Sequence, residues 1–136
     1  MKIATALALM LARLSGLVQV ILGALFWTGH ALTFIPVHMV VGLVLVLCLW
    51  TLAVLAARAG VQPGFVALAI AWGAVVPILG LNQAQLLPGP MHWVIQVLHL
   101  LLGLGAIAQA EGLAARLRVR LRPDRAATRA ALREGG

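Results

Sequence analysis

The chain has 136 residues, of which 63% are hydrophobic and only 10% charged, and its mean hydropathy is +1.08. This balance excludes an ordinary soluble globular domain, in which roughly a quarter of the residues are charged. Each helical crossing of a bilayer needs about 20 apolar residues, so the length allows one compact membrane bundle and leaves little chain for a soluble enzyme domain.

The positive charge is concentrated in the last part of the chain. The net charge is +7, and seven of the ten basic residues are arginines between Arg116 and Arg133. Beside a membrane exit, such a cluster favours a cytoplasmic position and contact with anionic lipid headgroups. No aromatic interleaving accompanies the charge, so nucleic acid is not an expected partner. Residues 116–136 are therefore predicted to form an arginine-rich cytoplasmic tail.

Hydrolytic chemistry lacks its usual residues. Cys48 is the single cysteine, which excludes a disulfide framework and a thiolate metal cluster. Ser15 is the only serine, and the three carboxylates (Glu111, Asp124 and Glu134) lie far from every histidine in the chain. A nucleophile with an adjacent base is missing, so no catalytic residue is assigned. If the protein takes part in a reaction, a bound cofactor is expected to supply the chemistry of a membrane redox protein.

Four apolar segments predict an all-α fold, an integral membrane four-helix bundle with up-down-up-down topology within residues 1–115. Their expected bounds are about 14–34, 36–57, 64–81 and 91–112, with the alternative that the first helix starts early and covers 3–27. Pro36 and Pro63 stand at helix starts, and Gly60 follows the second segment as a terminator. For residues 1–13, three fates stay open: a cleaved signal, an interfacial segment, or part of the first helix.

The distribution of basic residues predicts the topology. Lys2, Arg13, Arg58 and the tail fall before the first segment, between the second and third, and after the fourth, while the other two loops contain no Lys or Arg. The positive-inside rule then places both termini in the cytoplasm of a cell (cytoplasmic) membrane. All four histidines belong to the outer half of this bundle.

A polar stripe follows the fourth helix. His92, Gln96, His99 and Gly103 are spaced by four, three and four residues, which aligns them on one helical face. Ionisable groups inside a membrane are rare and usually face a partner, a cavity or a ligand. The stripe predicts a site centred on His99, with Gln96 in the same interior.

Two short motifs on different helices match each other: His38-x-x-x-Gly42 and His99-x-x-x-Gly103. Each glycine lies one turn beyond its histidine, where the missing side chain would leave room for a flat ligand. The four-helix plan and these motifs resemble the membrane b-type cytochromes. The resemblance implies haem b held by His38 and His99, in electron transfer or haem handling, with a quinone or redox protein as partner. Those cytochromes often carry two haems, and this chain has histidines for one.

The expected depths of the histidines along their helices also favour other pairs of ligands. His38 lies two residues past Pro36 and His99 nine past Pro90, which offsets them by roughly 10 Å if both helices begin level. Unless the fourth helix begins a turn or two higher, His30 with His38, or His38 with His92, would be better matched.

Two further hypotheses stay open. In one, His30, His38 and His92 form a zinc or copper site, with Met39 and Met91 beside two of them. In the other, the histidines are structural or proton-responsive groups that bond to Gln96, Asn82 or a carbonyl in an accessory subunit or small carrier of a larger complex. Homo-oligomerisation is compatible with each hypothesis.

Overall fold

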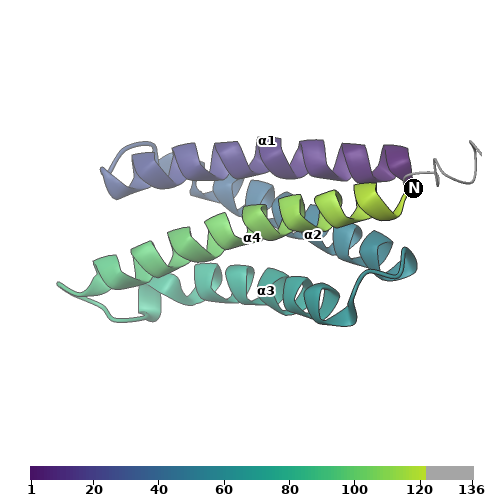
Figure 1. The fold of residues 1–136 in the computed structure, drawn as a ribbon. Coiled ribbons are helices and arrows are strands. Elements are labelled where there is room, and N and C mark those ends of the chain that lie inside the picture. The colour runs from purple at the N-terminus through teal and green to yellow at the C-terminus, as the bar shows by residue number, and fades with distance from the viewer. Residues whose placement is uncertain (122–136) are drawn as a thin grey trace, which may run out of the picture.

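The computed structural model describes residues 1–121, which form four long helices joined by short connections (Figure 1). The helices are α1 (Lys2–Trp27), α2 (Ile35–Arg58), α3 (Pro63–Asn82) and α4 (His92–Arg120), with short 3-10 helices η1 (Leu32–Phe34) and η2 (Gln83–Gln85). All four long helices are long and apolar enough to cross a membrane. The predicted all-α, four-helix fold is confirmed for the described part of the chain, which contains no strand.

The first helix follows the early alternative and begins at Lys2, so residues 2–13 belong to it. It ends at Trp27, as in that alternative and not at residue 34, because Gly29 adopts a left-handed conformation with φ of 76°. The backbone N–H of His30 then bonds to the carbonyl of Leu25 at 2.8 Å, which closes the helix end. Gly60, with φ of 72°, ends α2 in the same manner.

Successive helices run antiparallel, and α2 and α4 contact each other across the middle of the bundle (Figure 1). α1 and α3 flank this central pair, and no Cα atom of α1 lies within 8 Å of a Cα atom of α3. We call the end with the α1–α2 and α3–α4 connections the histidine end, and the end with Lys2, Arg58 and Arg120 the terminal end. The central position of α2 and α4 matters because they carry His38 and His99.

The fourth helix extends well past the expected exit at residue 112 and ends at Arg120. The basic and apolar alternation that marks the predicted tail therefore begins inside α4. Leu117 is fully buried, and the Arg116 guanidinium lies 3.7 Å from the centroid of the Phe65 ring. The rest of that tail, from Arg122 onward, lies outside the described residues.

The well-packed core occupies the terminal half of the bundle. The largest fully buried side chains are Leu9, Leu49, Leu52, Leu117 and Val46. Buried alanines surround them: Ala8, Ala12, Ala53, Ala56, Ala69, Ala106, Ala110 and Ala114. Small residues let helix backbones approach closely, which drives helix association in lipid. The helices are therefore closely packed at the terminal end, which leaves the histidine end to form a cavity.

Two tryptophans join neighbouring helices through the same arrangement. Trp50 of α2 donates its indole N–H to the carbonyl of Ile70 at 3.1 Å, and its ring fills the space beside Gly73. Trp72 of α3 donates to the carbonyl of Leu102 at 2.9 Å and fills the space beside Gly105 of α4. In each case the acceptor lies three residues before the glycine. These contacts hold α3 against both α2 and α4.

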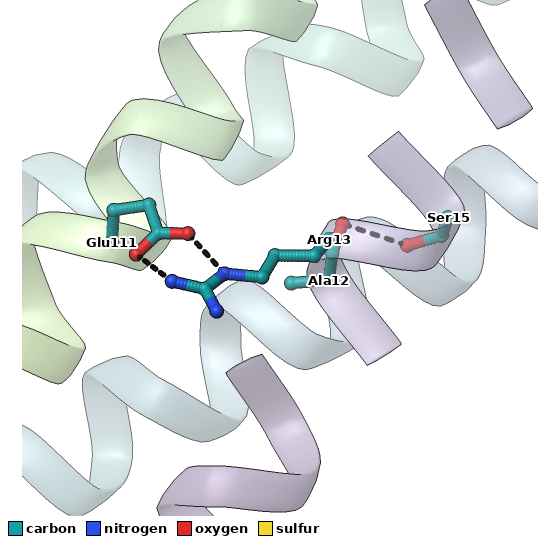
Figure 2. Close-up of polar contacts among 4 residues, drawn as sticks. All are labelled: Ala12, Arg13, Ser15 and Glu111. Atoms are coloured by element: carbon teal, nitrogen blue, oxygen red, sulfur yellow. Dashed lines mark hydrogen bonds and ion pairs between the residues drawn. The ribbon is translucent and has the colours of Figure 1, made fainter. Parts of the chain in front are cut away.

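One ion pair joins the first and last helices. Arg13 of α1 reaches across to Glu111 of α4, with Nε–Oε1 at 2.5 Å and a second N–O contact at 2.9 Å (Figure 2). Ser15 instead faces the core and donates to the carbonyls of Leu11 and Ala12. The ion pair holds α1 and α4 together in the terminal half.

Candidate functional site

A cavity of about 240 Å³ lies in the histidine half and is lined by all four long helices. Its polar side chains come from α1, α2, η2 and α4: Gln19, His38, Gln83, Gln96 and His99. The remaining walls are apolar or glycine: Val20, Gly23, Ala24, Phe26, Trp27, Gly42, Leu45, Val76, Leu100, Gly103, Leu104 and Ile107. Five of the predicted site residues, from two helices, therefore line one space.

The imidazoles of His38 and His99 lie close together in this cavity, with ring centroids 6.3 Å apart and planes inclined by 50°. The predicted depth offset is compensated by the helix starts. His99 is seven residues past the start of α4, and His38 is three residues past the start of α2. Because the two rings lie side by side, α4 begins about 6 Å, or roughly one turn, farther toward the histidine end than α2 does. The structure thus brings together the pair His38 and His99.

Both imidazoles are half-buried, and neither has a hydrogen-bond partner on its Nδ1 atom, although both atoms are enclosed. Phe26 of α1 contacts the His38 ring edge to face, with centroids 5.3 Å apart. A buried imidazole without a partner is costly, because it has lost water and gained no hydrogen bond in exchange. Within the described residues, no hydrogen bond to Nδ1 accounts for the position of either ring.

Glycines shape the surroundings of the pair, but not all in the predicted way. A Cβ atom at Gly80 of α3 would lie 2.9 Å from Cε1 of His99, so Gly80 makes room for that imidazole. Gly103 has no neighbouring heavy atom within 4 Å, which leaves the open space expected beside His99. Gly42 differs from the prediction: the amide of Gln19 fills its space, and a Cβ added to Gly42 would lie 2.6 Å from Nε2 of that amide.

The other two histidines lie outside the cavity and have local partners. His30 is exposed in the α1–α2 connection, where its Nδ1 lies 3.1 Å from Oγ1 of Thr28. His92 begins α4, and its Nδ1 lies 3.2 Å from the carbonyl of Leu86. Within residues 1–121, no three His, Cys, Asp or Glu side chains are close enough to hold a metal ion. The structure therefore does not assemble the hypothetical zinc or copper site of His30, His38 and His92.

Among the residues that the sequence did not predict, Gln19 and Phe26 line the cavity and Gly80 contacts His99. Gln19 lies in the cavity wall, and its Oε1 is enclosed without a partner. A signal for it existed, because Gln19 is four residues before Gly23 and so shares a helical face with a second cavity residue. For Phe26 and Gly80 no local pattern pointed to the site.

Partly exposed side chains of α1 and α4 border the cavity. Val20, Leu100 and Leu104 line it and are 37%, 37% and 44% exposed. α4 diverges from α1 toward the histidine end, whereas the two helices meet at the terminal end (Figure 1). Cofactor sites usually enclose about 300–1,000 Å³. This cavity, at about 240 Å³, would therefore enclose a large flat ligand only in part.

The residues present fit a bis-histidine cofactor site. Metal–imidazole bonds of about 2 Å put two ligating nitrogens on opposite sides of an ion about 4 Å apart. The ring centroids lie farther from such an ion than the ligating nitrogens do. The observed centroid separation of 6.3 Å is therefore compatible with this arrangement. The open space at Gly23 and Gly103 and the apolar walls suit the face of a macrocycle.

No family model, curated protein or solved structure matches this chain. The indications of function therefore come from the site alone.

Proposed function

We propose that this protein is a small integral membrane haem protein, in which His38 and His99 bind one haem b for electron transfer or haem handling. The proposal rests on a difference between two pairs of histidines in their location and hydrogen-bond partners. His30 and His92 have local hydrogen-bond partners at the surface. His38 and His99 face each other at 6.3 Å in a cavity and lack partners on Nδ1.

Five residues in and around the histidine pair have roles in this proposal. His38 and His99 would hold the haem iron, and Phe26 would fix the orientation of the His38 ring. The open space at Gly103 would accept the macrocycle, and Gly80 would let His99 approach. A haem held by these two imidazoles would supply one-electron chemistry to the site.

The same proposal includes the membrane arrangement. The four helices would span a cell membrane with both termini in the cytoplasm, because Lys2, Arg58 and the basic end of α4 gather at the terminal end. The haem would then lie in the outer half of the bilayer.

The decisive experiment compares four single variants purified in mild detergent from haem-replete cells. His38→Ala and His99→Ala test the proposed ligands, and His30→Ala and His92→Ala are matched controls from the same end of the bundle. We expect a Soret band with sharp reduced α and β bands in the parent and both controls, and at least a tenfold loss of haem in the two ligand variants. Circular dichroism verifies that each variant remains helical. Equal haem content in all four variants would refute the assignment.

A further inference from the structure

The histidine half of the bundle has no permanently charged side chain. No Lys, Arg, Asp or Glu occurs between residues 14 and 57 or between residues 59 and 110. The basic residues of the described part of the chain lie in the other half: Lys2, Arg13, Arg58, Arg116, Arg118 and Arg120. A ligand bound in the histidine half therefore meets no Lys or Arg among the residues that the structure describes.

The polar side chains of the cavity are amides and imidazoles: Gln19, Gln83, Gln96, His38 and His99. The proposed function assigns the imidazoles to the iron, which leaves the amides for other contacts with the ligand. An amide donates hydrogen bonds but carries no net charge. Burying a carboxylate without a cation costs far more free energy than burying an apolar group. The cavity therefore suits the apolar ring of a haem and offers no ionic partner to its propionate carboxylates.

Two of the amides lie on the side of the cavity nearer the histidine end. Gln96 is three residues before His99 on α4, which places it about 4.5 Å closer to that end. Gln83 belongs to η2, in the connection between α3 and α4 at the same end. Gln19 lies on the opposite side, where its amide fills the space at Gly42 and leaves no room for a further group. The carboxylates of a bound haem thus have one polar direction available, past Gln83 and Gln96.

We infer that the site recognises the iron and the ring of its ligand but not the carboxylates, which extend past Gln83 and Gln96 into water at the histidine end. The inference rests on the proposed haem site and specifies the class of macrocycle that this site accepts. Carboxylates that stay in water keep their hydration, so they contribute little to the binding free energy. A haem with esterified carboxyl groups is then as good a ligand as haem itself. A site with an Arg or Lys beside the carboxylates would prefer the acid.

The test titrates the purified, cofactor-free protein with haem and with haem dimethyl ester in the same detergent. The two probes have the same iron and ring and differ only in the charge of the carboxyl groups. Free imidazole in the same micelles, titrated with each probe, corrects for their different partitioning. We expect the Soret bands of the two complexes to give dissociation constants that agree within about threefold. A preference for haem of about tenfold or more would overturn the inference and leave the haem site standing.

An introduced cation tests the direction of the carboxylates. Gln83→Arg places a positive charge at the histidine end of the cavity, and Gln62→Arg places the same charge in the α2–α3 connection at the terminal end. We expect Gln83→Arg to prefer haem over the ester by about tenfold or more, and Gln62→Arg to bind both like the parent. No preference in Gln83→Arg, or an equal preference in both variants, would contradict the inferred direction. Gln96→Arg takes the place of Gln83→Arg if circular dichroism shows that the latter does not fold.

The same titrations separate this inference from the proposed function, because His99→Ala is titrated with both probes beside the parent. Equal binding of the two probes that is lost in His99→Ala supports the haem site and the inference together. If neither probe gives the parent a Soret band that His99→Ala removes, the haem assignment fails and the inference fails with it. Binding of haem alone, lost in His99→Ala, would overturn only the inference.

Discussion

The imidazole of His99 packs into the space left by Gly80 on the neighbouring helix α3, where an added Cβ would lie 2.9 Å from Cε1. This contact sets how close His99 comes to His38. It also makes α3, which carries no histidine, a determinant of the site.

We therefore expect Gly80→Ala to displace the His99 ring. Overpacking of this kind typically costs about 1–3 kcal/mol of the free energy of unfolding. Spectroscopically, it should lower haem content or shift the reduced α band, measured beside thermal unfolding. Gly64→Ala is the control, because nothing lies within 4 Å of a Cβ there. An unchanged spectrum with full haem in Gly80→Ala would mean that His99 is not a ligand at this position.

A substitution at Gly103 is expected to reduce haem binding without reducing the stability of the bundle. Its Cβ position meets no heavy atom within 4 Å, so Gly103→Leu should leave the cofactor-free bundle as stable as the parent. The larger side chain would occupy the space assigned to the macrocycle and should reduce haem content several-fold. Haem titration of purified, cofactor-free protein measures this, and full binding by Gly103→Leu would exclude that face of the cavity.

The tryptophan contacts predict where the bundle is least tolerant. A Cβ at Gly73 or Gly105 would lie 2.5 or 2.6 Å from the rings of Trp50 and Trp72. We expect Gly73→Ala and Gly105→Ala each to reduce the free energy of unfolding by about 1–3 kcal/mol. Denaturant unfolding in detergent micelles measures the loss against Gly64→Ala. Similar stability of all three variants would contradict the packing.

Replacing Gln19 is expected to increase the stability of the cofactor-free protein. Its Oε1 is enclosed without a partner, and an unsatisfied buried polar group costs about 1–3 kcal/mol. Gln19→Leu keeps a similar volume and removes that cost, so the cofactor-free protein should become more stable by an amount of this order. Thermal unfolding of the two cofactor-free proteins in the same detergent measures the difference. A destabilised Gln19→Leu variant would show that the amide has a partner in the membrane.

The topology predicts labelling from opposite sides of the membrane. In a Cys48→Ser background, Met91→Cys lies between α3 and α4, and Gln62→Cys lies between α2 and α3. An impermeant thiol reagent added to intact cells should label position 91 and reach position 62 only after permeabilisation. The reverse pattern would invert the orientation, and labelling of both from outside would exclude the four-span arrangement.

Much of the fold follows from local properties of the sequence. Apolar length predicts four helices, and Pro36, Gly60 and Pro63 predict the start and end of α2 and the start of α3, because a left-handed glycine or a missing N–H acts on its own turn. Helical spacing also predicts that Gln96, His99 and Gly103 share a face. These features need no knowledge of a neighbouring helix.

What only the tertiary structure decided depends on how helices cross. The pairing of His38 with His99 required the contact between α2 and α4 and the farther start of α4, neither of which is fixed by spacing within one helix. Gln19 beside Gly42, His99 beside Gly80 and Arg13 with Glu111 are likewise contacts between residues at least 19 positions apart. Such contacts arise from packing of whole faces, which a local pattern does not encode.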